Sequence, residues 1–248
     1  MILAAALSVA LAGVFAAAPR TALTVSPAHV ALDAGSRAAI RVEARTGSRL
    51  VLRASVAGLA LGLRGKPRIA ASHDAAPWLS VSPRTVDLGR AGATILIASR
   101  RQPSARPGDH TALVLLTATA GATKGMAVRL RVGVVVTVRV KGRRVHRVVA
   151  TAARARRAPP ARGALIEVTL ANRGNVIESI GGASLRITLL HRGRVIARLT
   201  VARRKVLPHT IAVVTVHYRG RSRGAVTVRV AVTRPSERPA VRSFPLRL

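Results

Sequence analysis

Val128-Arg-Leu-Arg-Val-Gly-Val-Val-Val-Thr-Val-Arg-Val140 is the stretch of sequence that decides the fold. Every even-numbered position in it is apolar, whereas odd positions hold Arg129, Arg131, Thr137 and Arg139. Side chains alternate between the two faces of a β-strand, so this pattern predicts a strand with one face in a core and one in solvent. An amphipathic helix would instead repeat its apolar residues every three or four positions.

The same alternation recurs along the chain, for example in Val226–Val232, Ile166–Leu170 and Leu185–Leu189, and turn-forming residues separate these segments. Strands are expected near 22–25, 37–44, 49–56, 78–82, 93–99, 110–119 and 126–140, and then near 145–151, 164–172, 183–190, 194–201, 209–218, 224–233 and 240–248. Residues 57–77 are expected to form a loop excursion with a short strand. Many short strands between turns are typical of antiparallel β-sandwiches.

We therefore predict an all-β protein with two immunoglobulin-like antiparallel β-sandwich domains after an N-terminal signal peptide. The expected divisions of the 248 residues are 1–18 for the signal, 19–142 for the first sandwich and 143–248 for the second. A basic, proline-containing segment at 152–162 lies near the start of the second domain. Each sandwich then has the ordinary size of a domain.

An unbroken apolar run from Met1 to Ala18 ends in three alanines and is typical of an export signal. Cleavage is expected after Ala18, or after Ala16 because Pro19 is an awkward residue to follow the cut. Since no Lys or Arg precedes the run, an uncleaved N-terminal anchor is the alternative. The predicted location is extracytoplasmic, either secreted or associated with the cell envelope. The chain has no cysteine, which excludes disulfides, thiol catalysis and a lipoprotein anchor.

The charge is strongly unbalanced, because 42 Lys and Arg against 8 Asp and Glu give a net charge of +34. One interpretation is a polyanionic partner, such as cell-wall polymer; the other is that a GC-rich genome supplies arginine as its default surface cation. Sequence-specific nucleic-acid binding is not expected, since no recognition helix or set of stacking aromatic residues is visible. The candidate polyanion-binding residues are Arg143, Arg144, Arg147, Arg154, Arg156, Arg157, Arg203, Arg204, Lys205, Arg219, Arg221 and Arg223.

Catalysis is not predicted, because the acidic residues and histidines are dispersed along the chain. Glu43 and Glu167 are expected on outward-facing strand positions, and Asp109-His110 reads as a turn entering a strand. No catalytic residue, metal site or cofactor is assigned, and a hydrolase concealed by the sequence is the remaining enzymatic alternative. Trp78 is interpreted as a core or interdomain residue, with an exposed ligand platform as the alternative.

Several short motifs carry a family resemblance, among them Trp78-Leu-Ser-Val-Ser-Pro83, Ala105-Arg-Pro-Gly-Asp-His-Thr111 and Val132-Gly-Val-Val-Val136. With Leu165–Gly174 they make the chain similar to the WxL-interacting surface proteins and, more distantly, to the periplasmic pilus chaperones. The resemblance implies two sandwich domains, no catalysis, and binding to wall polymer or a partner protein. WxL-interacting proteins usually end in a membrane span and a basic tail, and this sequence departs from them there. No chaperone anchor residue is transferred, because no position matches one.

Two functions remain open. The leading prediction is a non-enzymatic, exported envelope or cell-surface protein that binds anionic wall polymer or another surface protein, with membrane contact only through an uncleaved N-terminus. The alternative is a chaperone-like module that completes a partner's sheet through an edge strand. The candidate edge-strand residues are Val128, Leu130, Val132, Val134 and Val136. Salt distinguishes the two, since polyanion binding weakens with ionic strength and edge pairing does not.

Overall fold

The computed structural model describes residues 22–45, 50–71, 74–89, 91–119, 129–157, 163–220, 224–234 and 239–248. The predicted signal at 1–18 and the candidate residue Val128 lie outside this part of the chain. Two 3-10 turns occur in it, η1 (Ala76–Trp78) and η2 (Gly182–Ser184), and all other regular structure is β-strand. The predicted all-β fold with two immunoglobulin-like sandwiches is confirmed. No helix in the described part of the chain is long and apolar enough to span a membrane.

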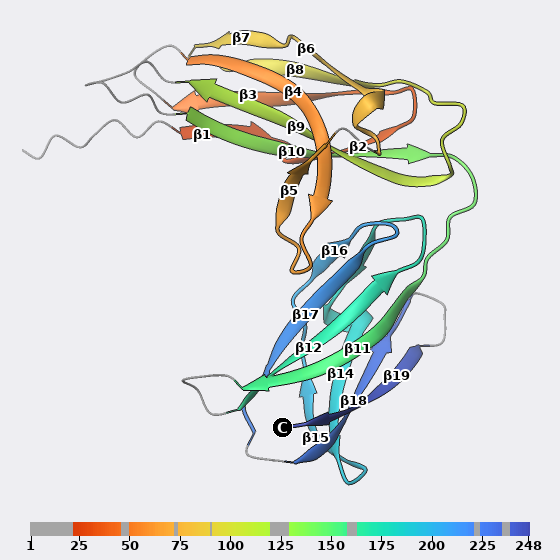
Figure 1. Cartoon of the computed structure of the whole chain (residues 1–248). Helices are drawn as coiled ribbons and strands as arrows, with labels where there is room; N and C mark the ends of the chain where they lie inside the picture. The colour runs from red at the N-terminus through yellow and green to blue at the C-terminus, as the bar shows by residue number, and fades with distance from the viewer. Residues whose placement is uncertain are drawn as a thin grey trace, which may run out of the picture.

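The first sandwich is built from the strands β1 (Ala22–Ser26), β2 (His29–Asp33), β3 (Arg37–Arg45), β4 (Leu50–Leu61), β5 (Pro67–Ala70), β6 (Leu79–Ser82), β7 (Thr85–Leu88), β8 (Ala93–Ser99), β9 (Gly108–Thr119) and β10 (Arg129–Val140). They form two facing sheets (Figure 1). One has the order β1-β3-β8-β6, and the other the order β2-β10-β9-β4-β5, with β7 also paired to β4. Residues 129–140 of the long alternating stretch therefore form β10 in the second of these sheets.

Aliphatic side chains fill the first core, since only 2% of the residues of the chain are aromatic. Ile40 and Ile95 from one sheet and Leu116 and Val136 from the other are completely buried. Val134, Val136 and Val138 of β10 lie in this core, whereas Arg129, Arg131 and Arg139 are exposed. The period of two thus decides which face of β10 is buried, because a shift by one residue would turn the arginines inward.

The second sandwich is built from β11 (Val148–Arg157), β12 (Ala164–Asn172), β13 (Glu178–Ile180), β14 (Leu185–His191), β15 (Arg194–Leu199), β16 (Arg204–Val206), β17 (Ile211–Tyr218), β18 (Ala225–Val232) and β19 (Ala240–Arg247). The sheet β11-β12-β17 packs on the sheet β15-β14-β18-β19, and β13 pairs with β16. Its core is a separate aliphatic cluster that contains Ile166, Ile187, Val230 and the buried Tyr218. A domain division after residue 142 stays a prediction; β10 ends at Val140 and β11 begins at Val148.

The structure differs from the predicted strands mainly between residues 57 and 77. There β4 continues to Leu61 and returns as β5, so the expected excursion is a β-hairpin that extends toward the second sandwich (Figure 1). The strands β2, β7, β13 and β16 were also not predicted. Each has at most five residues, which is too short for a period of two to be recognised.

Two leucines test the description of the core. Leu116→Ala should lower the free energy of unfolding by about 2–5 kcal/mol, because Leu116 is completely buried and its removal leaves a cavity. Leu96→Ala is the matched control, since Leu96 is 48% exposed and its loss should change stability by less than about 0.5 kcal/mol. Urea unfolding of both variants measures the difference, and equal effects would contradict the assigned faces.

Candidate binding site

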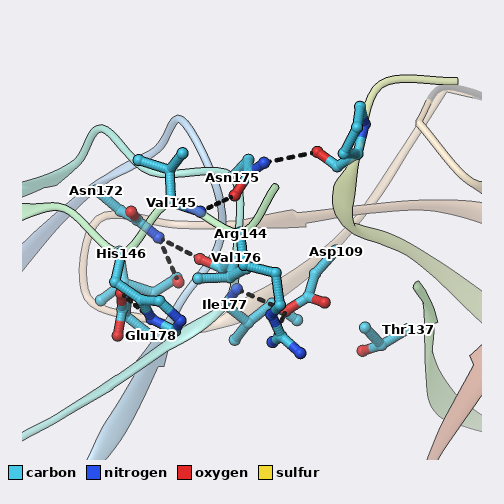
Figure 2. A network of polar contacts seen from close by, with 12 residues as sticks. Asp109, Thr137, Arg144, Val145, His146, Asn172, Asn175, Val176, Ile177 and Glu178 are labelled. Atoms are coloured by element: carbon cyan, nitrogen blue, oxygen red, sulfur yellow. Dashed lines mark hydrogen bonds and ion pairs between the residues drawn. The ribbon is translucent and has the colours of Figure 1, made fainter. Parts of the chain in front are cut away.

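Two groups of polar contacts join the sandwiches, and the first surrounds Asn175 (Figure 2). Its side-chain amide donates to the carbonyl oxygens of Pro107, at 2.7 Å, and Arg143, at 2.8 Å, while its Oδ1 accepts from the Val145 amide at 2.6 Å. The Asn175 backbone oxygen accepts from the Asp109 amide at 2.8 Å. One asparagine of the second sandwich therefore ties together the start of β9 and the connection from β10 to β11.

Asp109 completes this group from the first sandwich. Its Oδ2 accepts a hydrogen bond from the Ile177 amide at 2.9 Å and lies 3.9 Å from the Arg144 guanidinium (Figure 2). Sequence reasoning had no assignment for Asp109 beyond a turn, although it lies in β9 and is 9% exposed. Burial of a carboxylate at a junction requires such partners, so Asp109 helps to fix the two sandwiches relative to each other.

The tip of the β4–β5 hairpin makes the second group of contacts. The Leu63 carbonyl oxygen accepts from the Val213 amide at 2.6 Å and from the Arg204 guanidinium at 3.3 Å. Arg64 donates to Glu167 on β12 at 3.0 Å. Leu59, Leu113 and Leu207 form a small apolar cluster beside these contacts. The hairpin thus holds the second sandwich through both polar and apolar contacts.

Glu167 takes the outward-facing position predicted for it but is nevertheless buried. It points away from its own core, as predicted, but its side chain is only 3% exposed because the hairpin and two arginines cover it. Arg154 and Arg156 lie 2.5 and 3.5 Å from its Oε2. Burial alone would raise the pKa of Glu167, but the hydrogen bonds from Arg154 and Arg64 outweigh burial and lower it. No local sequence pattern could reveal this, since the covering hairpin comes from the other sandwich.

A cleft of about 670 Å³ opens between the sandwiches beside Asn175. Its walls include Arg106 and His110 from the first sandwich, Pro208 and His209 from the second, and Arg143 from the connection. In the described part of the chain no group of three or more His, Asp or Glu side chains is placed to hold a metal ion. The cleft is lined by both signs of charge, with Asp74 and Asp109 beside Arg106 and Arg143.

His110 has both ring nitrogens occupied. Nδ1 lies 2.6 Å from Asp74 Oδ1, and Nε2 lies 2.8 Å from the Arg106 carbonyl oxygen. A carboxylate and a carbonyl both accept, so the two nitrogens donate together when the ring is protonated. The Asp74 hydrogen bond raises the pKa of His110 despite the opposing effect of burial. With Nε2 engaged by a carbonyl, the pair has no free nitrogen to activate a nucleophile.

Trp78 packs partly buried against the first core, with its ring centroid 4.6 Å from that of His110. This placement agrees with the core interpretation rather than with an exposed platform. Asp74 also accepts hydrogen bonds from the Thr111 amide at 2.5 Å and the Thr111 hydroxyl at 3.3 Å. Trp78, Asp74 and His110 therefore form one local packing unit at the edge of the cleft.

The basic residues predicted to bind a polyanion do not share one environment in the structure. Arg154 and Arg156 pair with Glu167, and Arg204 donates to Val213 at 2.7 Å, with burial lowering its pKa. Arg143 and Arg144 are exposed at the junction. Arg147, Arg203, Lys205 and Arg219 are exposed elsewhere, while Arg221, Arg223 and the side chain of Arg157 lie outside the described residues. Their joint role in polyanion binding stays a prediction.

The edge of β10 is paired over only part of its length. On one side β9 pairs with the whole strand, and on the other β2 runs parallel to it only from Val135 to Arg139. Within the described residues, no strand pairs with β10 on that side before Val135. Of the candidate edge residues, Leu130 and Val132 are partly buried, whereas Val134 and Val136 lie fully in the core.

Backbone geometry shows which groups face the unpaired side. The Val135 amide donates to Ala28 at 3.1 Å, and the Arg139 carbonyl accepts from Ala34 at 3.0 Å, so odd-numbered residues of β10 direct their polar groups toward β2. These directions alternate along a strand. The amide and carbonyl groups of Gly133, Arg131 and Arg129 therefore face the side where no described strand accepts them.

Comparison with known proteins finds similarity only in structure. No known protein family and no curated protein matches the sequence. A solved structure of a chaperone–tip adhesin complex from CFA/I fimbriae biogenesis aligns with a TM-score of 0.53 at 12% identity, covering 90% of this chain and 98% of the other. The class 5 fimbriae chaperone CfaA aligns with a TM-score of 0.51 at 12% identity, covering 90% and 98%. The fold is thus like that of pilus chaperones, which is one of the two resemblances predicted from the sequence. The other, to WxL-interacting proteins, is not shown.

The His110–Asp74 pair predicts a pH-dependent contribution to stability. The raised pKa of His110 makes its contribution complete below about pH 6.5 and lost as the pH rises through the folded-state pKa. Burial raises the pKa of Asp74, but the hydrogen bonds from His110 and Thr111 lower it overall, so its contribution is present above about pH 3.8 and lost as the pH falls. The melting-temperature difference between the wild type and His110→Gln should therefore be largest near pH 5. A difference that grows above pH 8 would contradict this assignment.

Proposed function

We propose that this chain is a non-enzymatic, exported binding protein that adds a strand of a partner protein to the unpaired edge of β10. The observation that carries the proposal is the row of backbone groups at Arg129, Arg131 and Gly133 that no strand in the described part of the chain pairs with. Proteins normally cover or distort such an edge because it is a template for pairing with another chain. An unpaired edge of this kind is therefore suited to strand addition.

The side chains of this part of β10 also fit a strand partner. Leu130 and Val132 are only partly buried, so the core of the first sandwich is incompletely covered at this end. A partner strand would place its own apolar side chains beside them on the inner face of the sheet. The partner is accordingly a protein with an extended segment. The apolar N-terminal run of this chain is typical of an export signal and supports an encounter with the partner outside the cytoplasm.

The likeness of fold to pilus chaperones, at 12% identity, supports the same proposal. Binding of anionic wall polymer, the leading prediction from the sequence, has less support. Four of the twelve basic residues assigned to it, Arg144, Arg154, Arg156 and Arg204, are used in contacts inside the protein. Strand addition is therefore the better-supported of the two functions.

Gly133 allows a test that leaves the charge unchanged. Gly133→Pro removes the amide hydrogen that faces the open edge and places a ring carbon in the path of an incoming strand, while costing β10 no described hydrogen bond. Gly133→Ala keeps that hydrogen, and its added carbon would lie 3.5 Å from Leu113, an ordinary contact. Capture of exported proteins from the source cells at about 0.5 M salt should succeed with the wild type and Gly133→Ala and fail with Gly133→Pro.

Unfolding curves of the two glycine variants provide the control for folding, since both should remain as stable as the wild type to within about 1 kcal/mol. Equal capture by Gly133→Pro and Gly133→Ala would refute strand addition at this edge. Capture that disappears at high salt for every variant would instead favour binding through the basic residues.

A further inference from the structure

The face of the sheet next to the open edge carries a group of arginines outside the predicted basic set. Arg131 lies opposite Thr117, which lies opposite Arg53, and Arg53 lies opposite Thr85. Residues directly opposite one another in antiparallel strands share a face. One row across β10, β9, β4 and β7 therefore alternates arginine and threonine on the outer face of the first sandwich.

A second row lies beside the first and brings Arg129 opposite Thr119. The two rows border a groove of about 620 Å³. The polar residues that line this groove are Arg53, Arg84, Arg129, Ser55, Thr85, Thr117 and Thr119. Its walls thus combine guanidinium and hydroxyl groups, both of which donate hydrogen bonds to anionic oxygens.

These arginines have no acidic partner in the described part of the chain. No carboxylate oxygen there lies within 4.0 Å of the guanidinium groups of Arg53, Arg84, Arg129 or Arg131, in contrast to the three arginines around Glu167. Asp87 is the acidic residue in the second row; it is a diagonal neighbour of Arg53, and three strand spacings, about 14 Å, separate it from Arg129. The lining of the groove contains three arginines and no acidic residue, so it carries a net positive charge.

The same residues of β10 supply both this charge and the open edge. Arg129 and Arg131 direct their side chains to the exposed outer face and their backbone groups to the unpaired side. A strand added there would place alternate side chains directly beside the two guanidinium groups on that face. Its remaining side chains would point toward Leu130 and Val132 on the inner face. Each face of the incoming strand thus meets a different chemistry.

We infer that the partner segment alternates apolar and acidic residues, with the apolar ones on the inner face and the carboxylates paired to Arg129 and Arg131. This inference rests on the proposed strand addition and specifies the partner. Opposite charges across paired strands are favourable, and like charges directly opposite each other are unfavourable. A partner strand with Lys or Arg at the outward positions is thereby rejected.

Synthetic peptides of about ten residues test this choice of partner directly. One alternates Val and Glu, a second alternates Val and Gln, and a third has the composition of the first with its valines and glutamates in separate blocks. At about 0.15 M salt the full chain should bind the alternating Val/Glu peptide about tenfold more tightly than the Val/Gln peptide. The block peptide should bind no better than Val/Gln, because its carboxylates are not in register with the two arginines.

Variants separate local pairing from general attraction to a protein with a net charge of +34. Arg129→Glu combined with Arg131→Glu should abolish the preference for Val/Glu and favour an alternating Val/Lys peptide. Arg186→Glu combined with Arg229→Glu makes the same change in charge at two exposed arginines of β14 and β18. This control should keep the wild-type preference.

The outcomes distinguish failure of the inference from failure of the proposed function. Equal binding of Val/Glu and Val/Gln, abolished by Gly133→Pro, would overturn the acidic partner and leave strand addition intact. Val/Glu binding that is unaffected by Gly133→Pro, or that falls equally in both charge-reversed variants, would show capture by overall charge and overturn the inference. Binding of no alternating peptide would overturn both.

Discussion

The change of neighbour along one side of β10 is the constraint on which the functional account depends. From Val135 onward the strand lies between β9 and β2, and before Val135 the described structure supplies β9 alone. Because backbone polar groups require partners, this one change of neighbour turns half of an internal strand into an edge. The buried valines of β10 hold the edge in place, since they anchor its other face in the first core.

The junction between the sandwiches lies at the end of β9 and β10 opposite to this edge. Asn175 and Asp109 fasten one side of the junction, and the β4–β5 hairpin fastens the other through Leu63 and Arg64. Two separated points of attachment resist rotation more strongly than either alone, and the hairpin contact pairs Arg64 with the buried Glu167. The unpaired segment of β10 is itself held by its continuous pairing with β9, so a partner strand would meet an ordered edge, which lowers the entropic cost of binding.

The sequence alone predicted the strands that have a long alternation and the exposure of the arginines on β10. It could not predict contacts between residues that are distant in the chain. Glu167 illustrates this, because its outward direction follows from alternation whereas its burial depends on a hairpin about 100 residues away. The row from Arg131 to Arg53 illustrates it too, since only the register of β9 with both neighbouring strands places these arginines on one face. Charge counts alone directed attention to Arg154 and Arg204, which the structure uses internally.

Amide hydrogen exchange of the free protein, resolved for each residue of β10, tests the central claim most directly. If the edge is open, the amides of Arg131 and Gly133 exchange rapidly, whereas those of Leu130, Val132 and Val134, which face β9, are protected together with the core. This odd–even alternation should end at Val135, whose amide is bonded to Ala28. Equal protection of odd and even residues before Val135 would mean that another part of the chain covers the edge, and it would contradict the account.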